Sequence, residues 1–174
     1  MRLFLGIEIS ALQKQAIASL LSPVKNSEKG WENSHDYHIT TLFIGEVRDE
    51  EVTDIERKMG QVHSPPFSLV TSGVKFFNRR IMYLGFEDCE EVFRLRDRIR
   101  EVFPEYVRRD EKEFVPHITL KRWQRYEFDH LVNGLAEIPR TSFHIPVREL
   151  ALFKSEKDEA NRKYHVIFRS AFTS

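Results

Sequence analysis

The sequence predicts an α+β protein built from two similar halves that face each other across a groove. Apolar residues alternate in some segments and recur at helical spacing in others, which indicates strands and helices. The order strand, helix, strand, helix, strand occurs twice, and one offset of 79 residues brings the two copies into register. The same offset separates two copies of the tripeptide His-Ile-Thr. Because a solenoid needs more than two copies, this repeat favours two facing lobes.

The first half, roughly residues 1–78, contains five expected elements. Alternating apolar residues from Leu3 to Ile9 indicate the opening strand. Ser10 and Gln13 form a capping box that begins the first helix. The expected elements are strands at 3–9, 37–44 and 67–77 and helices at 12–21 and 52–59.

The second half, roughly residues 79–174, repeats this order. The segment Asn78-Arg79-Arg80 is typical of a tight turn into its first strand. The expected elements are strands at 81–86, 115–121, 142–147, 149–153 and 164–172 and helices at 92–102 and 128–135. Identity between the halves is weak, so an ordinary α+β domain with regular spacing is the competing interpretation. In both interpretations residues 1–174 form one domain.

Composition narrows the class of protein. Lys+Arg and Asp+Glu are equal at 27 each, whereas a protein that coats long nucleic acid is usually basic. Any nucleic-acid contact is therefore expected at one phosphate or one chain end. Cys89 is the only cysteine, so no disulfide can form within the chain. No apolar run is long enough for a signal peptide or a membrane span. We expect a cytoplasmic monomer with no membrane partner.

The repeated tripeptides, His38-Ile39-Thr40 and His117-Ile118-Thr119, each lie in an expected strand. Side chains alternate between the two faces of a strand, so each His and Thr share one face and each Ile points into the core. Only roughly 0.3 His-x-Thr matches are expected by chance in this composition, and one match alone would be weak. Two at equivalent points of a repeated element order indicate a paired site.

Two imidazoles suit the hydrolysis of a cyclic phosphodiester. Water must attack in line with the departing oxygen, so one group accepts a proton while another donates one on the opposite side of phosphorus. Imidazole serves either role near neutral pH. Hydroxyls of Thr40 and Thr119 can donate to the nonbridging oxygens, where negative charge must be held. This chemistry requires no metal and no cofactor.

The chain resembles the 2H phosphoesterase superfamily, and within it the RNA 2′,3′-cyclic phosphodiesterase family, historically called 2′-5′ RNA ligase. The segments that carry the resemblance extend over nearly the whole chain: MRLF at 1–4, HITTLFIGEV at 38–47, NRR at 78–80, FVPHITL at 114–120 and LFKSE at 152–156. One departure is Thr41, where the family usually has an apolar residue. We expect Thr41 to face the core.

This resemblance implies two antiparallel-sheet lobes with helices on their outer faces and an active-site cleft between them. It implies an enzyme that opens a terminal 2′,3′-cyclic phosphate of RNA or oligonucleotide 3′ ends to a 2′-phosphomonoester. The roles implied are proton donor for His38, proton acceptor for His117 and phosphate ligand for Arg122. Strict alternation would place Lys121 rather than Arg122 on the His117 face. A strand end or a bulge is therefore expected between Thr119 and Arg122.

Several alternatives stay open. The same groups would act on a small cyclic nucleotide or a 2′-5′ oligoadenylate, and the reverse reaction would join RNA ends without ATP. A binding module for RNA ends without turnover is the non-enzymatic alternative. His35-x-x-His38 lacks the further ligands of a metal site. Stacking of a terminal base on Phe76 or Phe77, beside the basic turn, stays open, whereas Trp31, Tyr83 and Trp123 are interpreted as packed in the core.

Overall fold

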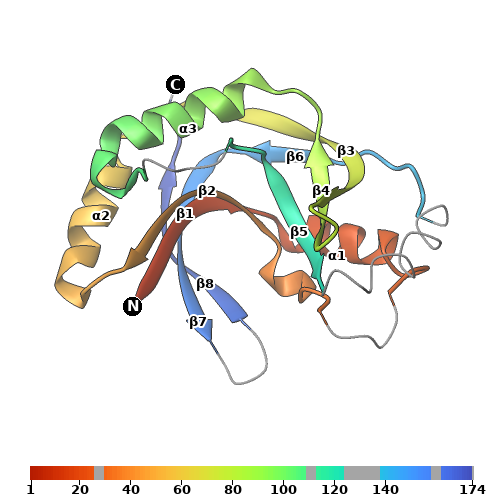
Figure 1. The fold of residues 1–174 in the computed structure, drawn as a ribbon. Helices are drawn as coiled ribbons and strands as arrows, with labels where there is room; N and C mark the ends of the chain where they lie inside the picture. Colours follow the sequence, from red (N-terminus) through yellow and green to blue (C-terminus); the bar gives the residue numbers. More distant parts are fainter. Residues whose placement is uncertain (26–29, 109–112, 124–137, 158–161, 174) are drawn as a thin grey trace.

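A computed structural model describes residues 1–25, 30–108, 113–123, 138–157 and 162–173, and its ribbon contains two four-stranded antiparallel sheets (Figure 1). The strands are β1 (Arg2–Glu8), β2 (His38–Glu46), β3 (Phe67–Phe77), β4 (Ile81–Phe86), β5 (His117–Arg122), β6 (His144–Val147), β7 (Glu149–Lys157) and β8 (Arg162–Ala171). The α-helices are α1 (Ala11–Leu20), α2 (Val52–Met59) and α3 (Glu90–Val102), and the 3-10 helices are η1 (Ser34–Asp36), η2 (Asp49–Glu51) and η3 (Pro104–Tyr106). This architecture confirms the expected α+β class.

The sheet orders show how the repeat is folded. One sheet has the order β2-β1-β7-β8 and the other β5-β4-β3-β6, and every pairing is antiparallel. An offset of 79 takes β1 onto β4, α1 onto α3, β2 onto β5 and β3 onto β7. The equivalent strands therefore occupy equivalent places in the two sheets.

The two sheets nevertheless do not coincide with the halves 1–78 and 79–174, because the third strands are exchanged. Strand β3 of the first half pairs with β4, and β7 of the second half pairs with β1. The turn between β3 and β4 gives the physical reason. Asn78 and Arg79 both have positive φ, and the Arg80 amide donates to the Phe77 carbonyl at 3.0 Å. Such a two-residue turn holds consecutive strands side by side.

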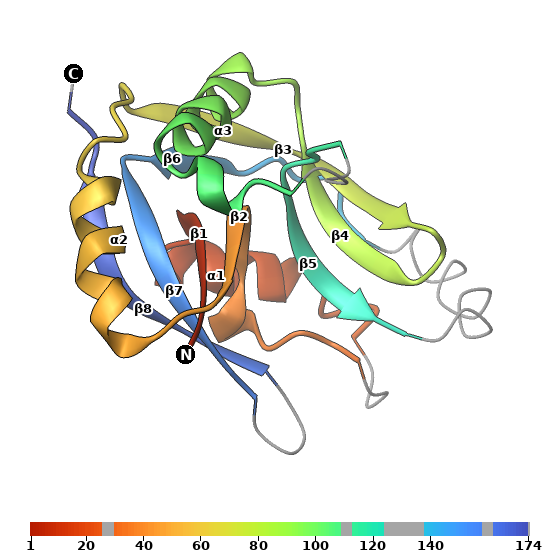
Figure 2. The same ribbon diagram turned by 60° about the vertical axis from the view of Figure 1, so that its left-hand side comes forward.

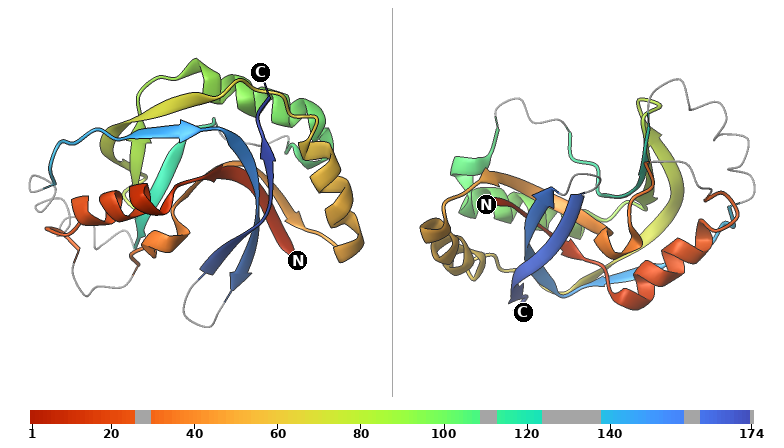
Figure 3. Two further views of the ribbon diagram at one scale, coloured as in Figure 1. Left: turned by 180° about the vertical axis from the view of Figure 1, so that it is seen from behind. Right: turned by 90° about the horizontal axis from the view of Figure 1, so that it is seen from below.

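The helices cover the outer faces of the sheets. Their apolar residues join one core with residues of both sheets, among them Ile17 of α1, Ile55 of α2 and Leu95 of α3. Figures 2 and 3 show α2 and α3 on one side of the molecule and α1 on the other. None of the helices in the described parts of the chain is long and apolar enough to cross a membrane.

Element bounds differ from the expectations mainly at strand ends. Strand β5 begins at His117 rather than near Val115, because Pro116 has no N–H to donate to a ladder. Strand β7 continues to Lys157, beyond the expected end at residue 153, since β8 pairs along its whole length. The helix expected at 128–135 lies outside the described residues.

Candidate active site

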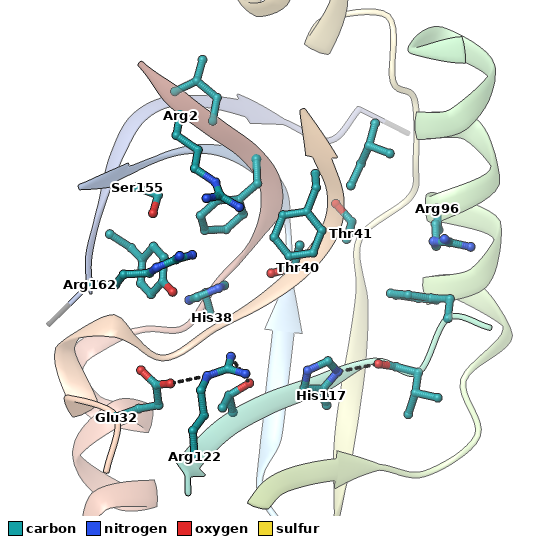
Figure 4. Close-up of a pocket in the computed structure, with 18 of the residues that line it drawn as sticks. Arg2, Glu32, His38, Thr40, Thr41, Arg96, His117, Arg122, Ser155 and Arg162 are labelled. Carbon is teal, nitrogen blue, oxygen red and sulfur yellow. Dashed lines mark hydrogen bonds and ion pairs between the residues drawn. The ribbon is translucent and has the colours of Figure 1, made fainter. Parts of the chain in front are cut away.

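A cleft of about 960 Å³ lies between the two sheets and is lined by all five residues that the sequence singled out. His38 and Thr40 come from β2, and His117, Thr119 and Arg122 come from β5 (Figure 4). Ile39 and Ile118, which separate each His from its Thr, are fully buried in the core. The alternation within each tripeptide is therefore as expected.

A β-bulge follows each tripeptide at the same place. In β2, Leu42 pairs with Leu5 and Thr40 with Gly6, which leaves Thr41 without a partner. In β5, Lys121 pairs with Met82 and Thr119 with Tyr83, which leaves Leu120 without a partner. A bulge shifts the alternation of the strand by one residue.

This shift decides which side chain enters the cleft after Thr119. Lys121 is 1% exposed, with its ammonium group 4.7 Å from the centre of the Trp31 ring, whereas Arg122 lines the cleft. The bulge expected between Thr119 and Arg122 is thus present. In β2 the same shift brings Phe43, rather than a cation, into the cleft. Thr41 is buried as expected, but it also borders the cleft.

Each imidazole is held by the same kind of hydrogen bond, from Nδ1 to a backbone carbonyl oxygen two residues earlier. The Nδ1 atom of His38 lies 2.6 Å from the Asp36 carbonyl oxygen, and that of His117 lies 2.7 Å from the Val115 carbonyl oxygen. Because a carbonyl only accepts, Nδ1 carries the proton and donates it. In the neutral rings Nε2 is then left as the acceptor, so each histidine offers Nε2 for proton transfer.

The surroundings of the two rings differ. The His38 ring packs among aromatic rings, with centroid distances of 4.8 Å to Phe4, 5.4 Å to Phe153 and 4.6 Å to Tyr164. This burial lowers the pKa of His38 to about 4, although the hydrogen bond to Asp36 opposes the shift. Burial also lowers the pKa of His117, and the Arg122 charge adds to the effect. Both histidines thus favour the neutral form.

His117 rests against a different pair of rings. Phe77 and Tyr83 are stacked with their centroids 4.0 Å apart, and both meet the His117 ring edge-on, at 5.0 and 5.5 Å. Tyr83 is 7% exposed, so its ring is occupied by packing, as the sequence interpretation held. Trp123, 8% exposed, packs edge-on against Phe76.

The guanidinium group of Arg122 is oriented by two neighbours. Its Nε atom donates to the Glu32 carboxylate at 2.8 Å, and Nη2 donates to the Thr119 hydroxyl at 3.3 Å. Glu32 is itself fixed, because its amide donates to the Leu120 carbonyl at 2.9 Å. Gly30, two residues before Glu32, has a φ of 95°, and a Cβ atom there would lie 1.9 Å from the Arg122 carbonyl oxygen. Only glycine fits this close approach.

Several residues of the site were not found from the sequence. They are Arg2, Phe4, Glu32, Phe153, Arg162 and Tyr164. Five of them lie in strands, where the sequence shows the alternation of faces but not which strands lie beside β2, and Glu32 lies in the segment before η1. No group of three or more His, Cys, Asp or Glu side chains suited to a metal occurs in the described parts of the chain.

Known proteins resemble this chain in sequence. A family model described as the 2′-5′ RNA ligase superfamily matches residues 11–159. A Thermotoga maritima protein named RNA 2′,3′-cyclic phosphodiesterase is 24% identical over 180 residues, which cover 99% of this chain and 96% of the relative. A protein of the same name from Archaeoglobus fulgidus is 28% identical over 131 residues, covering 72% and 74%.

Solved structures share the fold. The crystal structure of Escherichia coli LigT in apo form superimposes with a TM-score of 0.79 at 23% identity, covering 99% of this chain and 98% of that chain. A protein of Thermus thermophilus superimposes with a TM-score of 0.77 at 25% identity, with the same coverage. The two-sheet architecture is therefore one that solved structures also adopt.

Proposed function

The chain belongs to the 2′-5′ RNA ligase superfamily, and on that premise we propose that it is a phosphodiesterase that opens the 2′,3′-cyclic phosphate at the 3′ end of RNA or an oligonucleotide. The product is a 2′-phosphomonoester. One observation carries the proposal: two histidines from different sheets line one cleft, and each has Nδ1 occupied by a backbone carbonyl and Nε2 available. The names of the relatives support the choice of substrate.

Each of the two imidazole rings carries out one proton transfer. His117 accepts a proton from the attacking water at Nε2 as the water oxygen bonds to phosphorus. The bond from phosphorus to the ribose O3′ breaks, and His38 donates its Nε2 proton to that oxygen. The assignment of donor and acceptor follows the family resemblance. A phosphate anion bound between the rings raises both histidine pKa values, because it favours the protonated form. Positioned transfers of this kind contribute about 10²–10⁴-fold each.

The remaining polar groups hold the phosphate. Thr40 and Thr119 donate hydroxyl hydrogen bonds to the nonbridging oxygens, one from each sheet. Arg122, held by Glu32, brings a fixed positive charge to the same oxygens. Donors fixed before the reaction stabilise the charge of the transition state without reorganising, and this is usually a large part of catalysis.

The test is the identity of the product. A short RNA ending in a 2′,3′-cyclic phosphate is incubated with the protein in EDTA, and the phosphate isomer is assigned by ³¹P NMR. We expect the 2′-phosphomonoester alone. A 3′-phosphomonoester would overturn the assignment of the leaving oxygen. Tight binding without turnover would instead favour a module that binds RNA ends.

The pH dependence gives a second readout of the same assay. Catalysis needs His38 protonated and His117 neutral, and the fraction of enzyme in this state is highest midway between the two pKa values. Both pKa values of the free enzyme lie below the ordinary value of about 6.5. We therefore expect a bell-shaped profile of kcat/KM with its maximum on the acid side of pH 6.5.

A further inference from the structure

Two arginines outside the described acid–base machinery line the cleft on the side of the β2-β1-β7-β8 sheet. Arg2 stands at the start of β1 and Arg162 at the start of β8, and both line the cleft together with Ser155 of β7. Figure 4 shows these three residues grouped on one side of His38, with Arg122 on the other side. These residues come from distant parts of the sequence, so no local sequence motif indicates that they lie together.

Strand register explains why they gather. Arg2 pairs directly with Ser155, and Ser155 pairs with Tyr164 on its other side. Arg162 lies two residues before Tyr164, on the same face of β8. The sheet therefore presents Phe4 and Phe153 near His38 and, beyond them, a polar layer of Arg2, Ser155 and Arg162, in which Tyr164 lies level with Ser155.

Along β1, the polar layer follows directly after the aromatic residue that contacts His38. Arg2 lies two residues from Phe4 along β1, and Phe4 contacts the His38 ring. Two residues of a strand advance by about 6.7 Å, which is the scale of one sugar–phosphate unit. A chain whose terminal phosphate lies at His38 would bring its next phosphate to the polar layer.

The charge of this layer is not neutralised by the residues that the structure describes. Neither Arg2 nor Arg162 makes an ion pair with any residue that the structure describes, although Glu46 lies opposite Arg2 in register. Arg122 and Arg169, by contrast, are paired with Glu32 and Glu8. The chain has no net charge, so two cations that form no ion pair with the described residues on one cleft wall do not reflect a generally basic surface.

We infer that Arg2 and Arg162, with the Ser155 hydroxyl, bind the phosphodiester immediately 5′ of the terminal nucleotide. This inference rests on the proposed function and names its substrate class as RNA of two or more nucleotides. The guanidinium groups donate to the nonbridging oxygens of that internal phosphate, which is not broken. Planar guanidinium forks suit this recognition of phosphate oxygens.

Three substrates test the inference. They are a 2′,3′-cyclic mononucleotide, a dinucleotide with the same cyclic end, and that dinucleotide with a neutral methylphosphonate in place of its internal phosphodiester. For the unaltered protein we expect kcat/KM to be about tenfold higher for the charged dinucleotide than for either other substrate, since a charged contact is lost in both. Equal values for the charged and neutral dinucleotides would overturn the inference, because base contacts alone would then explain any preference.

Variants locate the effect. We expect Arg2→Gln and Arg162→Gln each to reduce the ratio of kcat/KM between charged and neutral dinucleotide several-fold, and the double variant to bring it close to one. The matched control is Lys163→Gln, which removes a positive charge from the opposite face of β8 and should keep the ratio of the unaltered protein. If the ratio survives in the double variant, the subsite lies elsewhere and the inference fails.

The two proposals fail in different ways. If the unaltered protein opens none of the three substrates, the proposed function is wrong. If it opens all three at the same kcat/KM, the proposed function stands and the subsite is rejected. Thermal unfolding of each variant, compared with the unaltered protein, separates a loss of the subsite from a loss of the fold.

Discussion

Strands β2 and β5 present the same tripeptide, the same bulge and the same imidazole hydrogen bond, but in different surroundings. His38 lies among three aromatic rings, and the fifth residue beyond it is Phe43. His117 has a less enclosed position, and the fifth residue beyond it is Arg122. The backbones of the two strands are thus nearly equivalent, whereas the side chains around the two histidines differ.

The two strands show how a nearly symmetric frame gives two histidines different environments. Burial among apolar rings penalises a charged imidazole, so the two sides differ in proton affinity. Strand β5 supplies a cation, Arg122, whose charge lowers the pKa of both histidines, whereas β2 supplies Phe43 at the equivalent place, which is 56% exposed and offers a flat apolar surface. A phosphate therefore meets unequal neighbours, although both sides supply one imidazole and one hydroxyl.

Replacing either histidine is the largest expected perturbation. We expect His38→Ala and His117→Ala each to lower kcat by about 10²–10⁴-fold, since each removes one positioned proton transfer. The matched control is His35→Ala. His35 is an exposed histidine outside the lining of the cleft, so this variant should have the kcat of the unaltered protein. Steady-state kinetics on the cyclic-ended RNA measures all three. Full turnover by either cleft variant would refute the acid–base assignment.

Replacing the residue five positions beyond each histidine, Arg122 or Phe43, tests the asymmetry of the cleft directly. We expect Arg122→Gln to lower kcat/KM by about 10- to 100-fold, because a hydrogen-bonded positive charge next to the phosphate is lost. Phe43→Leu keeps an apolar side chain and should cost less than tenfold. Arg122→Lys should recover only part of the loss, since an ammonium group cannot hold Glu32 and phosphate in one fork. Equal losses for Arg122→Gln and Phe43→Leu would contradict the asymmetry.

The smallest expected effect is on stability at acid pH. The pKa of His38 is about 4 in the folded protein and about 6.5 when unfolded, so the unfolded chain binds more protons between these values. The contribution of His38 is therefore complete above pH 6.5 and is lost as pH falls toward 4, by up to about 3 kcal/mol. Urea unfolding at pH 7 and pH 4.5 measures it.

Matched variants assign this stability change to one side of the cleft. His38→Gln should remove more of the difference between the two pH values than His117→Gln, because the His38 ring is the more enclosed. The unaltered protein supplies the reference for all other titrating groups. A larger effect of His117→Gln would reverse the comparison between the two strands.

Local patterns account for what was correct in the sequence interpretation. Period-two alternation put each His and Thr on one face, with Ile39 and Ile118 in the core. The same rule showed that Arg122 needs a bulge to reach the cleft, and the unpaired Leu120 is that bulge. These inferences hold because they depend only on neighbours along one strand.

The local sequence already indicates the described strands and helices and the paired histidines, since each depends on a few consecutive residues, and the repeat is inferred from their order. The exchange of β3 and β7 between the two sheets becomes visible only in the three-dimensional fold. The exchange places Phe153 beside Phe4, and β8 brings Tyr164 against His38. Pairing of distant strands is decided by the turns and the shared core, which no single segment contains. For that reason the pKa of His38 and the gathering of Arg2 with Arg162 follow from the fold.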